Sequence, residues 1–301
     1  MAFDMETFLQ EIKQRKDYVD SCLQSCLKEV DAYPPLIHEA MYYAVFNGGK
    51  RLRPIMVFEG ARIAGGREED VAPAACAIEM IHSYSLVHDD LPCMDDDDFR
   101  RGKPTCHKVF GEANAVLTGD ALLTAAFELL GRCAGVKGIE AGNLLRVIEE
   151  IAHAAGSRGM VGGQVVDLES EGKEIDYQTL KTLHSLKTGE LFKASLRVGA
   201  ILCGIDEEKL KALTGYAHYF GLAFQISDDI LDVKGDEALT GKPVGSDEKN
   251  HKTTYPSLLG MEKSNELLAE SAASCIKSLE GFGEEAGFLR RLACFTLYRE
   301  S

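Results

Sequence analysis

Two clusters of aspartate residues stand out in this chain of 301 residues. The first lies in segment 88–103, HDDLPCMDDDDFRRGK, and the second in segment 224–232, FQISDDILD. Each cluster follows an apolar segment with helical spacing. A solvated acidic surface would explain the acidic residues but not their position at the ends of apolar helices. Asp228 and Asp232 are four residues apart, so they face the same way on a helix. Two such carboxylates can hold a hard cation such as Mg²⁺ and leave coordination positions for water and phosphate.

The first cluster has looser spacing. Cys93 stands four residues after Asp89, the next aspartate is Asp95, and Pro92 between them must loosen or end the helix. One acidic run alone is usually a solvated loop, but two runs attached to apolar helices favour a shared cation site. An EF-hand loop needs Glu at its twelfth position, where counting from the candidate aspartates gives Arg, Cys or His. The calcium-loop interpretation therefore fails.

Basic residues lie where a bound anion needs them. Arg100 and Arg101 follow the first cluster at once, either as surface ion pairs of little energetic value or as a clamp for phosphate. A second group, GGKRLRP, covers residues 48–54. It is not a P-loop, since Arg51 stands where Ser or Thr is required and no strand precedes it. It is either a diphosphate cradle or a helix C-cap with solvated charges.

The sequence around these motifs predicts helices. In residues 5–30 apolar side chains recur at helical spacing with charges on the other face, and Pro34-Pro35 follow. Further helical stretches are expected over 36–46, 52–64, 68–90, 106–134, 141–171, 176–203, 207–234 and 256–281. No run of strands with turn chemistry between them is found. The sequence predicts an all-α fold, with the helices of one domain over residues 1–301 packed as a large bundle.

Composition restricts the class of protein further. Apolar residues make up 45%, and 33 basic against 48 acidic residues give a net charge of −15. Nucleic acid and anionic membranes need a positive field, so neither is an expected partner. No apolar stretch approaches the roughly 18 residues of a membrane helix, and the acidic N-terminus does not resemble a signal peptide. Nine cysteines without a CxxC pair indicate free thiols in a reducing cytosol.

Together these motifs resemble the trans-isoprenyl diphosphate synthases, specifically the bacterial farnesyl diphosphate synthases (geranyltranstransferases). The resemblance runs from about residue 40 to the C-terminus. Besides the two aspartate motifs and segment 48–54, it rests on EMIH at 79–82, GQVVDL at 163–168, KTG at 187–189, GK at 241–242 and KTTYP at 252–256. It implies the isoprenoid synthase fold, a helical bundle around a central active-site cavity, and a single polyprenyl synthetase domain.

The resemblance also implies a reaction. A C5 or C10 allylic diphosphate, dimethylallyl or geranyl diphosphate, is joined head to tail to isopentenyl diphosphate, and diphosphate is released. Ionisation of the allylic C–O bond is the hard step, and Mg²⁺, three ions in this family, offsets the charge of the leaving group. The implied metal ligands are Asp89, Asp90, Asp95 and Asp228, with Asp229 and Asp232 supporting them.

Substrate-binding residues follow from the same resemblance. Arg100, Lys187 and Lys242 match contacts of the allylic diphosphate, and Lys252 adds to them. Thr188 and Gln225 match polar groups that stabilise the allylic cation, with plain interhelical hydrogen bonding as the alternative. Isopentenyl diphosphate is expected opposite, held without metal by Lys50, Arg53, His82 and Arg101, although a lone His on such a helix is more often a core residue. The released diphosphate is expected to take the final proton.

Product length is expected to depend on residues one turn before the first cluster. Tyr84 and Ser85 lie five and four residues before Asp89. In this family an aromatic residue at the Tyr84 position limits the product to C15, so farnesyl diphosphate is the expected product. The two-residue insertion between Asp90 and Asp95 is shared by C15 and some C20 enzymes. Tyr84 as an ordinary core aromatic residue remains the alternative.

Other interpretations stay open at this point. One alternative is a geranylgeranyl diphosphate synthase, which would make a C20 product. A second is a class I terpene cyclase, although such an enzyme has no use for the second diphosphate site. A third is a non-catalytic synthase subunit, although such subunits typically lose one of the two aspartate clusters. The resemblance implies a cytoplasmic homodimer. Segment 234–252 is either a lid that orders on substrate binding or a solvated loop. Arg299 resembles the family's basic tail, weakened here by Glu300.

Overall fold

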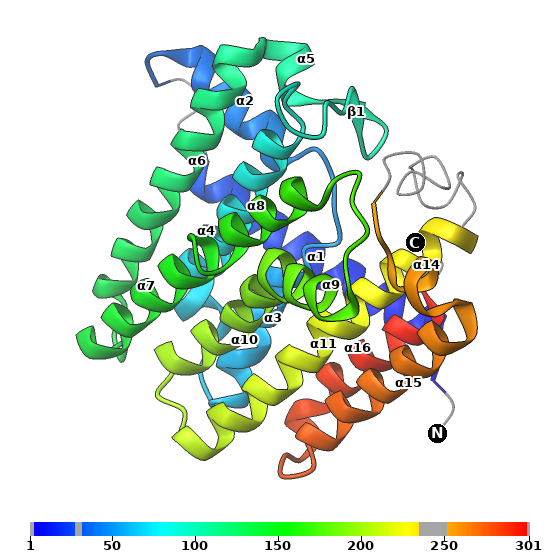
Figure 1. The fold of residues 1–301 in the computed structure, drawn as a ribbon. Coiled ribbons are helices and arrows are strands. Elements are labelled where there is room, and N and C mark those ends of the chain that lie inside the picture. The colour runs from blue at the N-terminus through cyan, green and yellow to red at the C-terminus, as the bar shows by residue number, and fades with distance from the viewer. Residues whose placement is uncertain (1–2, 28–31, 235–251, 300–301) are drawn as a thin grey trace.

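The computed structural model describes residues 3–27, 32–234 and 252–299, and its described part is almost entirely helical (Figure 1). The helices are α1 (Met5–Cys26), α2 (Pro35–Val45), α3 (Leu52–Ile63), α4 (Glu68–Asp89), α5 (Cys106–Phe110), α6 (Glu112–Arg132), α7 (Ala141–Ala155), α8 (Met160–Ser170), α9 (Tyr177–His184), α10 (Glu190–Leu202), α11 (Glu207–Lys234), α14 (Tyr255–Leu259), α15 (Met261–Ser278) and α16 (Gly287–Tyr298). Short elements are β1 (Phe99–Arg100), β2 (Lys103–Pro104), η1 (Cys133–Gly135), η2 (Ser185–Gly189) and η3 (Glu284–Ala286). The expected all-α fold is confirmed.

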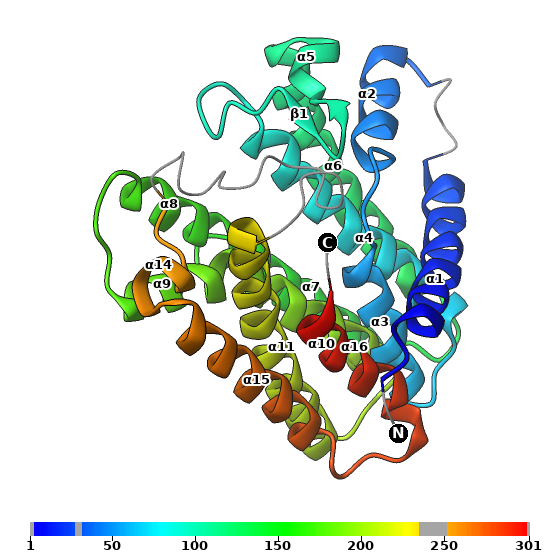
Figure 2. The same cartoon turned by 90° about the vertical axis from the view of Figure 1, so that its right-hand side faces the viewer.

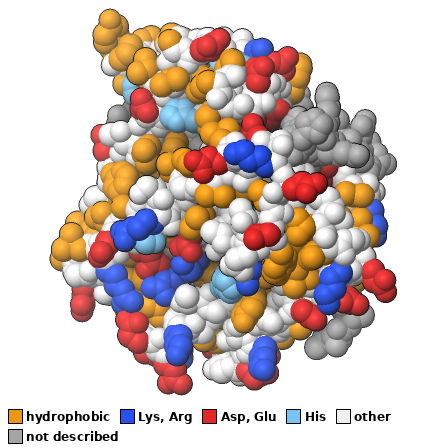
Figure 3. All heavy atoms as spheres, in the orientation of Figure 1, with side chains coloured by type: hydrophobic (Ala, Val, Ile, Leu, Met, Phe, Trp, Pro, Cys, Tyr) orange, Lys and Arg blue, Asp and Glu red, His pale blue; other side chains and the backbone are white. Residues whose placement is uncertain are grey.

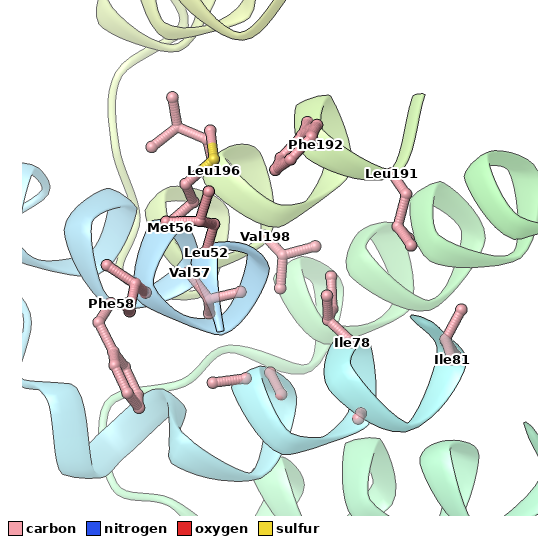
Figure 4. Packing of buried hydrophobic residues seen from close by; sticks show 14 of the residues in the cluster. Leu52, Met56, Val57, Phe58, Ile78, Ile81, Leu191, Phe192, Leu196 and Val198 are labelled. Atoms are coloured by element: carbon pink, nitrogen blue, oxygen red, sulfur yellow. The ribbon is translucent and has the colours of Figure 1, made fainter. Parts of the chain in front are cut away.

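The centre of the bundle is formed by α3, α4 and α10. Apolar side chains of these three helices fill the space between them, including Met56 and Val57 of α3, Ile78 of α4 and Phe192 of α10 (Figure 4). Helices α6, α7 and α11 pack around this centre, and α15 and α16 cover α11 (Figure 2). Buried residues follow one another along most of α3 and along the middle of α4, as expected of core helices.

Two glycines allow α3 and α10 to cross in direct backbone contact. A Cβ added to Gly60 would lie 2.0 Å from the carbonyl oxygen of Leu196, and one added to Gly199 would lie 1.8 Å from that of Val57. No larger side chain fits at either position without moving a helix. This crossing fixes α3, whose first turn carries Arg53, against α10, which continues from the turn that carries Lys187.

Several expected helices are broken where the sequence pattern continues. The stretch 106–134 divides at Gly111 and the stretch 256–281 divides at Gly260, both in the left-handed region with φ of 83° and 79°. The stretch 141–171 divides between α7 and α8. Helix α16 and the two-residue hairpin of β1 and β2 were not expected. Apolar periodicity is the same on both sides of such breaks, so it does not reveal them.

The expectation that no apolar stretch is long enough to span a membrane is not met by one helix. By length and composition Glu112–Gly135, which contains α6, reaches membrane-spanning length, with a mean hydropathy of 1.3 over its most apolar window, of which 39% is buried. Its buried side packs against α4, as a core helix of a bundle does. The surface view shows apolar side chains among charged ones, including along the edge where α6 and α7 lie (Figure 3).

Candidate active site

A cavity of about 740 Å³ lies between the C-terminal halves of α4 and α11. Its wall also includes residues of segment 49–53, the C-terminal end of α8, the turn η2, segment 252–254 and Arg299. The cavity therefore brings together both aspartate clusters and the basic segment, which are far apart in the sequence. This is the arrangement that the motifs predicted.

The aspartates reach the cavity from opposite sides. Asp89 and Asp95 line it at the end of α4, and three aspartates of α11 line it from the other side: Asp228, Asp229 and Asp232. Asp90 is not on the described cavity wall. It is buried and accepts two hydrogen bonds from Nε of Arg100, at 2.7 and 3.0 Å. Asp229 is also engaged, since one of its oxygens accepts the backbone N–H of Tyr255 at 2.9 Å.

Basic side chains of the protein pair with the carboxylates of the cavity. Nζ of Lys252 lies 3.4 Å from Asp95, and Arg299 pairs with Asp228 while donating to Ser227 at 2.8 Å. Such a set of hard oxygen donors, partly neutralised by movable cations, fits Mg²⁺. A bound ion would take over the neutralisation and release these cations for an anionic substrate.

Asp167 is a site residue whose role the sequence did not reveal. It comes from α8 and forms a 2.6 Å ion pair with Lys187, and Lys252 lies 3.9 Å away. Burial alone would raise the pKa of Asp167, but Lys187 and Lys252 hold it below its usual value. At Asp89 burial prevails over Lys187 and raises the pKa to about 6. A cation beside Asp89 would lower that pKa again.

Lys187 and Thr188 lie on η2, a single π-helical turn between α9 and α10. Such turns are rare and often mark functional sites. Gly163 of α8 permits the close approach, since a Cβ there would lie 2.3 Å from the backbone nitrogen of Lys187. Both residues line the cavity, as does Gln225, whose amide nitrogen is 3.5 Å from Asp228. These three predicted residues are thus brought beside the aspartates.

The residues predicted to hold an anion without metal also lie together. Lys50, Arg53, His82 and Arg101 all line the cavity. Burial, followed by Arg299, lowers the pKa of Lys50, and burial lowers that of Arg53 to about 10. The guanidinium of Arg53 stacks 4.3 Å from the ring centre of Phe192, and its buried Nε has no partner among the described residues. A buried guanidinium nitrogen without a partner favours a place for an anion beside Arg53.

His82 contributes as a neutral imidazole. Burial, then Arg53 and its neighbouring guanidinium groups, holds its pKa well below the usual value. Nη1 of Arg53 lies 3.3 Å from Nε2 of His82, and since a guanidinium can only donate, Nε2 accepts and the proton is on Nδ1. His82 is therefore part of the cavity wall rather than a core residue.

Arg51 anchors the segment that carries Lys50 and Arg53. Its φ is 56°, and its buried side chain donates to Asp20 at 2.9 Å, Glu79 at 2.7 Å and the carbonyl of Val45 at 2.6 Å. One guanidinium thus joins α1, the end of α2 and α4. Arg101 also has a left-handed φ, 54°, and donates to the carbonyl of Gly48. A Cβ on Gly49 would collide with that guanidinium.

The predicted chain-length residues lie off the described cavity wall. Tyr84 is buried and its ring contacts that of His88, 5.8 Å between centres. The hydroxyl of Ser85 donates to the carbonyl of His82 at 2.9 Å. Leu86 is the residue of that turn that lines the cavity. Lys242 and most of the predicted lid lie outside the described residues.

Comparison with known proteins agrees with this geometry. Residues 34–284 match the model of the polyprenyl synthetase family. The chain belongs to that family. It is 47% identical over 265 residues to a farnesyl diphosphate synthase of Geobacillus stearothermophilus, covering 88% of each chain. It is 44% identical over 274 residues to a geranylgeranyl diphosphate synthase of Cyanophora paradoxa, covering 90% of this chain and 89% of the other.

A solved structure is similar over nearly the whole length. The FPP/GFPP synthase of Zymomonas mobilis superposes with a TM-score of 0.85 at 37% identity, covering 97% of this chain and 99% of the other. The isoprenoid synthase fold is therefore confirmed. The family depends on Mg²⁺ in general, in agreement with the carboxylates of the two aspartate clusters that line the cavity.

Proposed function

We propose that this polyprenyl synthetase family member is a Mg²⁺-dependent prenyltransferase that condenses isopentenyl diphosphate with dimethylallyl or geranyl diphosphate to give (2E,6E)-farnesyl diphosphate. One observation carries the proposal. The same cavity is lined by two groups of residues suited to a diphosphate: the aspartates with Lys187 and Lys252, and the basic residues Lys50, Arg53 and Arg101 with the neutral His82. A condensation of two diphosphates needs both.

The allylic diphosphate would bind between the two aspartate clusters. Asp89, Asp90, Asp95 and Asp228, with Asp229 and Asp232, would hold Mg²⁺, three ions by the family resemblance. Bound Mg²⁺ supplies Lewis-acid stabilisation of the leaving diphosphate. Lys187 and Lys252, with Arg100 and Lys242, would bind the oxygens on which charge accumulates as the C–O bond breaks. Asp167 holds Lys187 in place for this role.

Isopentenyl diphosphate would bind to Lys50, Arg53, His82 and Arg101. Its double bond then attacks C1 of the allylic cation, while oxygen dipoles of Thr188 and Gln225 stabilise the positive charge. The new cation loses a proton from C2 of the isopentenyl unit, and the released diphosphate is the base. Holding both diphosphates in fixed positions converts the encounter of two substrates into a step within one complex.

Product length is proposed to be set by Tyr84, with Ser85 beside it. The ring of Tyr84 is buried in the turn before Asp89 and would stop the growing chain at C15. The similarity to a geranylgeranyl diphosphate synthase keeps C20 as the second candidate product. Formation of a C20 product requires the prenyl tail to pass the position of Tyr84.

We also propose a homodimer, acting in the cytoplasm as one catalytic domain of residues 1–301. Helix α6 exposes Val116, Leu117 and Phe127, with exposed fractions of 42%, 55% and 37%. A second copy would cover this apolar face. Light scattering tests it: the chain should have the mass of two copies, and Leu117→Glu should shift the mass to one.

The test of the reaction uses geranyl diphosphate with and without isopentenyl diphosphate, in Mg²⁺. A synthase consumes geranyl diphosphate only when isopentenyl diphosphate is present, whereas a terpene cyclase consumes it alone.

Arg53→Lys should raise the KM for isopentenyl diphosphate at least tenfold and leave that for geranyl diphosphate within about twofold, because the bidentate, ring-stacked guanidinium is lost. Consumption of geranyl diphosphate alone would overturn the proposal.

A further inference from the structure

A second group of possible metal ligands lies outside the cavity, on the loop that follows the first aspartate cluster. Asp96, Asp98 and His107 each place one donor atom within 4.8 Å of the donor atoms of the other two. None of the three lines the cavity described above. The two aspartates are exposed, and His107 is 5% exposed.

The imidazole of His107 has an unused nitrogen. Nδ1 lies 3.1 Å from the hydroxyl of Thr105, and Nε2 is buried without a hydrogen-bond partner among the described residues. A buried, unpaired ring nitrogen is costly unless a ligand satisfies it.

The surroundings of His107 fix which nitrogen can accept. The hydroxyl of Thr105 donates to the carbonyl of Asp98 at 3.4 Å, and the N–H of Thr105 donates to the same oxygen at 3.0 Å. Since the hydroxyl has one proton, it accepts from Nδ1–H, and Nε2 keeps its lone pair. Metal-bound histidines are usually oriented in this way by a hydrogen bond at the other nitrogen.

The two carboxylates lie within reach of this imidazole. Asp96 has a left-handed φ of 51°, its N–H donates to the carbonyl of Leu91 at 3.1 Å, and its side chain is exposed. Oδ1 of Asp98 pairs with Lys108 at 2.6 Å. A carboxylate has a second oxygen, so this pair lowers the affinity of Asp98 for a cation without preventing coordination.

We propose that Asp96, Asp98 and Nε2 of His107 form a second metal site that binds a divalent transition ion of the Zn²⁺, Co²⁺ or Mn²⁺ class. An imidazole ligand favours these ions over Mg²⁺, which prefers oxygen donors alone. The site ties the loop to the start of α5. That loop carries Asp95 at one end and Arg100 at the other, so a bound ion holds both at the cavity. The reaction itself does not pass through this ion.

Equilibrium dialysis of the full chain against Co²⁺ in excess Mg²⁺, without substrate, tests the proposal. The wild-type chain should bind one more cobalt ion than Asp96→Asn, in which Asn tolerates the left-handed backbone. His107→Asn should lose the same ion. Thr105→Val, nearly equal in volume, should weaken binding 10- to 100-fold because it frees the ring to turn.

The control is Asp97→Asn, which removes the same charge from the same acidic run but lies outside the group of three. It should keep the extra ion. Equal cobalt binding by the wild type and Asp96→Asn overturns the proposal. So does loss of the ion in Asp97→Asn, which would mean diffuse attraction to acidic charge. If His107→Asn fails to fold, Asp96→Asn alone decides the outcome.

Discussion

Asp167 and Lys187 illustrate what single residues contribute to the site. The sequence supplied the residue types, because paired aspartates and nearby cations suit a metal and a diphosphate. It could not supply the partners. Lys187 and Asp167 are 20 residues apart, and Arg299 reaches Asp228 from 71 residues away. Such pairs depend on how the helices pack, which residue spacing does not determine.

Asp167→Asn should weaken catalysis through Lys187. The amide removes the negative charge that anchors the ammonium group, a loss of about 2 kcal/mol for a hydrogen bond between charged groups. The value of kcat/KM for geranyl diphosphate should fall about 30-fold, with the KM for isopentenyl diphosphate unchanged. Steady-state kinetics measures both. Glu169→Gln, an exposed change on the same helix, is the control, and an equal fall in both variants would contradict the assignment.

Tyr84→Ala should lengthen the product. Removing the buried ring opens space beneath Asp89, so the prenyl chain can grow past C15 to C20. Chromatography of the dephosphorylated prenols gives the lengths. Tyr84→Phe keeps the ring volume and should still make C15. If Tyr84→Ala also makes only C15, another residue limits the chain.

At the scale of elements, apolar periodicity located most helices but not their interruptions. Gly111 and Gly260 each have φ near 80° and end one helix as the next begins. The π-helical turn η2 also could not be predicted, because its surroundings, such as the close approach of Gly163 from another helix, depend on how the helices pack. Of these departures, η2 lies on the cavity wall, where close approach of backbones is common.

The crossing of α3 and α10 gives a prediction about stability. Gly199→Ala places a methyl group against the carbonyl of Val57, so the two backbones must separate. We expect a loss of about 3 kcal/mol in the free energy of unfolding, measured by urea titration. A Cβ on Gly131 of α6 meets nothing within 4 Å, and Gly131→Ala should be neutral or stabilising by up to about 1 kcal/mol. Equal stability of Gly199→Ala and the wild type would contradict the crossing.

At the scale of the whole molecule, a net charge of −15 surrounds a cavity that must bind two anions. Basic residues are concentrated at the cavity and offset this negative charge locally. Several titratable groups around the cavity are buried as a result. His184 lies on the cavity wall with its ring 5.4 Å from that of Tyr255. Burial lowers the pKa of His184 from 6.5 to about 4.

That shift predicts how stability changes with pH. The unfolded chain protonates His184 near pH 6.5 and the folded chain only near pH 4, so the contribution is present above pH 6.5 and is lost as the pH falls. Between pH 7 and pH 5 it should cost about 2 kcal/mol in the free energy of unfolding. His184→Gln should show a pH dependence smaller by that amount in urea titrations. An unchanged dependence would mean that His184 is not buried as described.

The most direct measurement of the proposed function is a product assay. The purified chain is incubated with isopentenyl and dimethylallyl diphosphate, with Mg²⁺ or with a chelator, and the dephosphorylated prenols are sized. We predict mainly the C15 alcohol, formed only with metal, because the residues of both proposed diphosphate sites line one cavity. Absence of condensation by the folded chain with Mg²⁺ present would contradict the account.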